Sequence, residues 1–144
     1  MGNLYKENMV VGDLRSWFTT ILDNKLNCSK QTTSYIINVF STYSRSEVSL
    51  TKESIVLAFI HAKQSYSFVE FQSLGDWVLW SKTFRNEGIL SYNDVYESLG
   101  RISYQTCYKL LAKKWPLYEE LADLLPEITN NVRVIINDQM IVNI

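Results

Sequence analysis

The residues of this chain that could do acid, base or metal chemistry are few. His61 is the only histidine, and Glu70 and Asp76 are the carboxylates best placed to support it. A protein metal site needs at least three ligands, and neither a His-x-x-x-His nor a Glu-x-x-His spacing is present. We therefore expect His61 to be a structural or surface histidine, and we expect no metal site.

Other catalytic patterns are equally sparse. There is no Gly-x-Ser-x-Gly nucleophile turn, and the five glycines are scattered singly rather than gathered in a phosphate-binding loop. Cys28 and Cys107 lie far apart with no Cys-x-x-Cys spacing, so we expect two buried free thiols, with a disulfide as the alternative. A Ser-His-Asp or Cys-His arrangement stays open, but the sequence favours a non-enzymatic protein with no catalytic residues and no cofactor.

Asp76 is the most informative acidic residue, because it lies between Gly75 and Trp77 in a strongly apolar stretch. A buried charge is costly unless it is paired. We expect Asp76 to pair with Arg101 or to accept a hydrogen bond from Tyr104. In the alternative readings it ties two helices together or faces solvent.

Aromatic residues gather around the same stretch. Trp77 and Trp80 are three positions apart on one helical segment and could stack on a ligand ring or a base. Core packing is the simpler reading of large aromatics. If a ligand site exists, it would lie between the two helices of a hairpin over residues 70–111. Its residues would be Asp76, Trp77, Trp80, Arg101, Tyr104 and Tyr108.

The net charge is −1, so no overall field favours nucleic acid. Lys109, Lys113 and Lys114 could bind nucleic acid, but the basic residues near them are spread over two helical segments and balanced by acidic ones. Residues 116–144 hold one basic residue, Arg133, against five acidic ones, which we read as a solvated helix face rather than a site for a basic partner. Nucleic acid is therefore not the expected partner.

Apolar side chains recur three and four positions apart in six segments of the chain, which is the period of amphipathic helices. Gly75 and Gly100 would allow two of these helices to cross closely, and Pro126 would end or kink the last one after Leu125. The segments cover residues 14–26, 35–43, 55–63, 68–84, 92–111 and 117–128. The break at 65–67 is optional, so we expect five or six helices.

The period changes near the end of the chain. Val132, Val134 and Ile136 alternate with other residues, and Asn137-Asp138-Gln139 is typical of a turn. Residues 132–144 therefore predict a short β-hairpin, paired within the chain or with a second copy. The expected fold is a single all-α domain over residues 1–144, a helical bundle with this C-terminal β-hairpin.

Three stretches taken together resemble an all-helical family of uncharacterised bacterial proteins. They are residues 35–45, Leu74-Gly75-Asp76 with the aromatic segment to Phe84, and residues 96–104. The resemblance covers about residues 32–128 and implies a helical fold, but it implies no activity, cofactor or catalytic residue. The composition, rich in Asn, Ser, Tyr and Lys, suits an AT-rich genome such as that of a phage or a marine bacterium.

The sequence contains no apolar run of signal-peptide or membrane-spanning length, so we expect a cytoplasmic protein without a membrane partner. The favoured function is a self-associating protein-interaction module, a homo-oligomer that could also bind another protein. The alternatives are a small-ligand-binding protein with a pocket in the central hairpin, or a nucleic-acid-associated protein.

Overall fold

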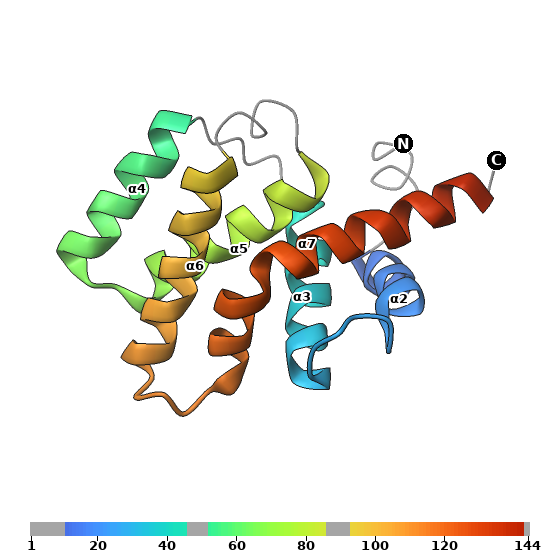
Figure 1. Cartoon of the computed structure of the whole chain (residues 1–144), viewed down its shortest axis with the longest axis horizontal. Coiled ribbons are helices and arrows are strands. Elements are labelled where there is room, and N and C mark those ends of the chain that lie inside the picture. The colour runs from blue at the N-terminus through green and yellow to red at the C-terminus, as the bar shows by residue number, and fades with distance from the viewer. Residues whose placement is uncertain (1–10, 46–51, 86–92, 143–144) are drawn as a thin grey trace.

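The computed structural model describes residues 11–45, 52–85 and 93–142, and within these ranges all regular structure is helical. Figure 1 shows the arrangement, in which α5 lies at the centre and contacts α3, α4, α6 and α7. The α2 helix packs on α3 and on α7, and α4 packs on α5. The six helices are α2 (Val11–Leu22), α3 (Lys30–Tyr43), α4 (Lys52–Ser65), α5 (Phe68–Phe84), α6 (Asn93–Leu110) and α7 (Pro116–Val142).

Several helix starts follow directly from local chemistry. Ser29 caps α3 by accepting a hydrogen bond from the Thr32 N–H, and Ser67 caps α5 by accepting from the Glu70 N–H. Pro116 is the first residue of α7, where its fixed φ suits the helix and its missing N–H is not needed. The caps predicted at Thr51 and Ser91 lie outside the described residues.

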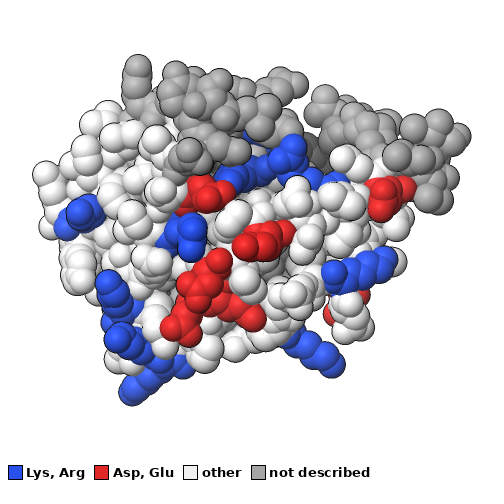
Figure 2. Space-filling view, in the orientation of Figure 1, with Lys and Arg blue, Asp and Glu red and all other residues white. Residues whose placement is uncertain are grey.

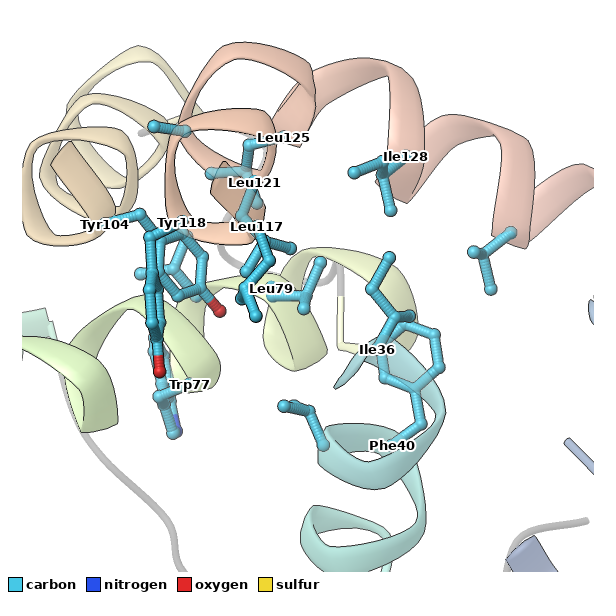
Figure 3. Packing of buried hydrophobic residues seen from close by; sticks show 14 of the residues in the cluster. Ile36, Phe40, Trp77, Leu79, Tyr104, Leu117, Tyr118, Leu121, Leu125 and Ile128 are labelled. Carbon is cyan, nitrogen blue, oxygen red and sulfur yellow. The ribbon is translucent and has the colours of Figure 1, made fainter. Parts of the chain in front are cut away.

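The hydrophobic core is built from the inner faces of these helices. Phe18, Phe40 and Phe84 come from α2, α3 and α5 and form ring contacts with centroids 5.0–6.0 Å apart. Figure 3 shows leucines of α7 stacked toward Leu79 of α5. Leu121 of α7 is fully buried in the same cluster, and α7 packs on α6, α5, α3 and α2.

The predicted β-hairpin at residues 132–144 is wrong. Residues 132–142 continue α7, no strand occurs within the described residues, and residues 143–144 lie outside them. The alternating apolar residues are also compatible with a helical stripe, because Ile128 and Val132 are one turn apart and both are buried. The cost is that Val134 then points outward and stays exposed.

Pro126 does not end α7, although it lies inside the helix. Figure 1 shows that α7 changes direction partway along, so that its second half runs across α2 and α3. A proline removes one helical hydrogen bond and its ring crowds the carbonyl four residues earlier, which bends the helix. After the bend, the last part of α7 contacts α2 and α3.

Two further observations concern the apolarity of the helices and the state of the cysteines. Within the described helices, none is both long and apolar enough to cross a membrane. Cys107 is buried, Cys28 is partly buried, and both thiols are free rather than joined in a disulfide.

Candidate functional site

Asp76 lies where three helices meet and receives two hydrogen bonds on the same atom. Tyr35 of α3 donates to its Oδ1 atom over 2.7 Å, and Tyr104 of α6 donates to the same oxygen over 2.8 Å. The expected bond from Tyr104 is therefore present, and the bond from Tyr35 is additional. Through this one carboxylate, α5 is tied to both α3 and α6.

Gly75 makes this geometry possible. A Cβ atom at this position would lie 2.6–2.8 Å from ring atoms of Tyr104, closer than any side chain tolerates. Gly100 plays the reciprocal part on α6, where a Cβ would lie 2.7 Å from Val78. The close crossing of two helices predicted from these glycines is thus confirmed, and it brings the Tyr104 hydroxyl within reach of Asp76.

A fourth helix joins the cluster through Tyr118 of α7. Its ring contacts those of Tyr35 and Tyr104, with centroids 5.6 Å and 6.3 Å away. Figure 3 shows Tyr104 and Tyr118 side by side. The Tyr118 hydroxyl accepts a hydrogen bond of 2.8 Å from Gln72 of α5. We call these five residues, Tyr35, Gln72, Asp76, Tyr104 and Tyr118, the Asp76 cluster.

The surroundings of Asp76 change its acidity. Burial raises the pKa of Asp76 to about 6, while the hydrogen bonds from Tyr35 and Tyr104 oppose the rise. Burial also raises the pKa of Tyr104 well above its ordinary value, and the neighbouring Asp76 charge adds to the effect. The tyrosines therefore remain hydrogen-bond donors, and the carboxyl group changes its protonation state near neutral pH.

Arg101 is not a partner of Asp76. Its Nε atom donates to the backbone carbonyl of Ala122 in α7 over 2.9 Å. In a regular helix that carbonyl would accept from the N–H of residue 126, but residue 126 is proline and has no N–H. Arg101 thus satisfies a carbonyl that Pro126 leaves without its helical donor.

The other predicted ligand-binding residues do not converge on one pocket. Trp80 is partly buried and donates to the Ser44 hydroxyl over 3.3 Å. Trp77 is buried in the core, and Tyr108 is partly buried against it. Asp76 and Tyr104 alone of the six are joined by a hydrogen bond, so the ligand-binding role of this set stays a prediction. Tyr35 was not among the predicted site residues, because its spacing placed it in the helical segment over residues 35–43.

His61 is paired rather than free. Its Nδ1 atom lies 2.5 Å from Glu70 Oε1, and the Ser65 hydroxyl donates to the other oxygen of Glu70. These hydrogen bonds, that from Ser65 first, lower the pKa of Glu70. The contacts fasten the end of α4 to the start of α5. No group of three ligating side chains that could hold a metal is found within the described part of the chain.

A shallow acidic pocket of about 390 Å³ lies beside the start of α7, lined by Ser29, Pro116, Glu119, Glu120, Asp123 and Leu124. Glu120 is already engaged there, since its Oε1 accepts from the Ser29 N–H over 3.1 Å and from the Ser29 hydroxyl over 2.9 Å. Burial opposes ionisation, but hydrogen bonds from Thr32 and Ser29 prevail and lower the pKa of Glu120. The carboxylate therefore serves as a tertiary cap for α3.

Exposed apolar side chains are concentrated in one part of the described chain, which the sequence did not predict. Of the nine large hydrophobic residues exposed within the described ranges, five lie between residues 56 and 69. They belong to α4, the turn after it and the start of α5. We call this surface the α4 face; its residues are Val56, Leu57, Ile60, Tyr66 and Val69.

In comparisons with known proteins, no family model, no curated protein and no solved structure matches the chain. The resemblance to a helical bacterial family over residues 32–128 therefore stays an expectation.

Proposed function

We propose that this protein is an interaction module that self-associates through the α4 face. The observation that carries the proposal is the clustering of exposed apolar side chains on that face, with Leu57 and Val69 each 65% exposed and Tyr66 60% exposed. Apolar surface of this kind is stabilised when it is removed from water, and contiguous exposed patches mark association sites.

The distribution of apolar residues around α4 also supports contact with a partner on its outer side. Ile55 and Ala62 are fully buried on the inner side, while Val56, Leu57 and Ile60 are exposed on the outer side. A helix at the surface of a monomer has a polar outer face, whereas a helix that is apolar all round is covered on both sides. The outer side of α4 is mixed, because His61, Lys63 and Gln64 are also exposed there. The strip formed by Val56, Leu57 and Ile60 is the part of that side that has the composition of a covered surface.

Tyr66 adds an anchor at the edge of the face. Its backbone φ is 55°, a left-handed conformation that is rare for a bulky residue. The exposed ring packs edge-on against Phe71, with centroids 6.3 Å apart and an interplanar angle of 89°. Tyrosine is enriched among the residues that dominate binding energy, because a rigid ring covers a large area at low entropic cost.

A second copy of this chain is the partner that fits best. The net charge is −1, so two copies repel one another only weakly. The five residues of the α4 face carry no charge, and a two-fold axis through α4 would place the same apolar patch on both sides of the interface. Self-association therefore needs no complementary surface elsewhere on the molecule.

The test is the oligomeric state of the wild type and two matched variants, measured by native mass spectrometry and analytical ultracentrifugation. We expect a dimer for the wild type and a monomer for Leu57→Glu, because a carboxylate in the interface would be desolvated without a partner. Val134→Glu is the control, since Val134 is also exposed, at 53%, but lies on α7. A monomeric wild type, or equal disruption by both variants, would overturn the proposal.

One observation favours a second candidate, the binding of a small ligand. The Trp77 Nε1 and Ser81 Oγ atoms, one helical turn apart on α5, are buried and have no hydrogen-bond partner among the described residues. Buried donors are almost always satisfied, so a carbonyl oxygen of a ligand could bind there. The same native mass experiment separates the candidates, because a ligand adds mass to a monomer.

A further inference from the structure

The connection between α6 and α7 gathers basic residues beside an exposed tryptophan. Lys109, Lys113 and Lys114 are all exposed, and Trp115 is 48% exposed. The three other tryptophans are buried or partly buried. Figure 2 shows basic side chains gathered at the corner of the molecule where Figure 1 places this connection. We call these four residues, Lys109, Lys113, Lys114 and Trp115, the basic corner.

Backbone hydrogen bonds fix the shape of this corner. The Lys113 N–H donates to the Tyr108 carbonyl over 2.9 Å, and the Ala112 N–H donates to the Lys109 carbonyl over 3.0 Å. This is the Schellman arrangement that closes a helix, with Ala112 and Lys113 in left-handed conformation at φ 56° and 60°. The lysines therefore extend from a defined turn, which reduces the entropy lost when they bind.

These three lysines are also available. Within the described part of the chain none of them forms an ion pair, whereas Lys82 is held by Glu97 over 2.6 Å. Glu97 lies twelve residues before Lys109 on α6, which is about 18 Å along the helix axis. Glu97 is thus distant from the basic corner and engaged with Lys82. The acidic residues nearest to the corner in sequence are Glu119, Glu120 and Asp123 at the start of α7, and Glu120 is engaged with Ser29.

We infer that the basic corner binds single-stranded nucleic acid, with the three lysines on phosphates and the indole of Trp115 stacked on a base. A positive surface that follows the backbone and an aromatic ring that stacks on a base are the two parts of such a site. From the sequence, nucleic acid was not the expected partner, because the basic residues are spread over two helical segments and balanced by acidic ones. Three of them, Lys109, Lys113 and Lys114, lie within six residues of one another, and the structure leaves all three exposed.

An anionic membrane fits the same surface less well. Recognition of acidic lipids typically uses clusters of four to eight basic residues, and interfacial binding needs an apolar face to insert. Here the residues flanking Trp115 are Lys114 and Pro116, and the next apolar side chain, Leu117, is buried. A lone half-exposed indole suits stacking on a single base better than insertion into lipid.

The test is fluorescence anisotropy of a labelled 12-nucleotide oligo(dT) or oligo(U) titrated with the full chain at several salt concentrations. Because each phosphate contact on a single strand contributes about −0.7 to the slope of log K against log salt, three contacts predict a slope of about −2. Trp115→Ala should weaken binding about 10-fold and leave the slope unchanged.

Replacing Lys109, Lys113 and Lys114 together by Gln should bring the slope close to zero. The matched control replaces three exposed lysines elsewhere, Lys25, Lys30 and Lys63, by Gln and should leave both affinity and slope unchanged. Circular dichroism checks that each variant is folded.

Three outcomes would overturn the inference. The first is no oligonucleotide binding by the wild type at about 50 mM salt. The second is equal loss of binding in the two triple variants. The third is binding to phosphatidylserine vesicles without binding to the oligonucleotides, which would assign the corner to membranes instead.

Discussion

The side chain of Arg101 donates a hydrogen bond of 2.9 Å to the backbone carbonyl of Ala122. In a regular helix this carbonyl would accept a hydrogen bond from the N–H of residue 126, but Pro126 has none. A residue of α6 therefore supplies the missing donor at the bend of α7. The hydrogen bond joins α6 to α7 at the point where Pro126 removes a backbone hydrogen bond from α7. This compensation is consistent with α7 bending at Pro126 and continuing beyond it.

Replacing Arg101 by Met should therefore destabilise the protein by about 1–3 kcal/mol, because it leaves a buried carbonyl without a donor while keeping much of the side-chain stem. In a Pro126→Ala background the helical N–H is restored, and the same Arg101→Met change should cost less. Urea unfolding of the four proteins gives the coupling energy. Additive effects would contradict the assigned role of Arg101.

The Asp76 carboxyl should make stability depend on pH between 5 and 7. Its folded pKa of about 6 lies above the ordinary value near 4, so the folded state favours the protonated form. The stabilisation is fully present below about pH 4 and is lost as pH rises through 6. The free energy of unfolding should fall by up to about 3 kcal/mol from about pH 3 to pH 7, and a little under half of this fall lies between pH 5 and 7.

The control for this prediction is Asp76→Asn, which keeps an oxygen acceptor for Tyr35 and Tyr104 but cannot ionise. Its stability should be flat between pH 5 and 7 and should exceed that of the wild type at pH 7. Glu70 and Glu120 have lowered pKa values, so they lose their charge below this window and do not obscure it. A wild type with flat stability over this window would show that Asp76 ionises normally.

Gly75→Ala should destabilise the protein by about 1–3 kcal/mol, since the added methyl group would overlap the ring of the fully buried Tyr104. Alanine is the better helix former, so propensity alone predicts the opposite sign. Ser73→Ala, at an exposed position of the same helix, provides the comparison. Thermal unfolding of both variants decides between packing and propensity, and a stabilised Gly75→Ala protein would refute the close crossing.

Ala112→Gly should stabilise the protein by about 1 kcal/mol. Ala112 has a φ of 56° at the end of α6, and glycine adopts this left-handed conformation without the steric cost of a Cβ atom. Ala58→Gly, in the interior of α4, should have the reverse effect by a similar amount. Chemical unfolding measures both changes, and a loss of stability in Ala112→Gly would mean that the turn is not strained.

The sequence by itself determined the helices and some of their contacts. Apolar spacing located six helical segments, because a helix presents one face to the core every 3.6 residues, but it ended the last one near residue 128 and wrongly predicted a hairpin after it. Gly75 and Gly100 predicted a close crossing of α5 and α6, because helices can approach this closely only where a side chain is missing. The bond between Asp76 and Tyr104 was one of the partners expected for a buried carboxylate.

Only the tertiary structure decided the rest. Val132 is compatible with a strand or a helix on local pattern, and in the structure it is buried one helical turn after Ile128, within α7. Tyr35 meets Asp76 across 41 positions of sequence, a contact that no local spacing encodes. The three lysines of the basic corner are grouped in the sequence itself, but the exposure of Trp115 and of the α4 face depends on the packing of the helices, which determines which side chains remain in contact with water.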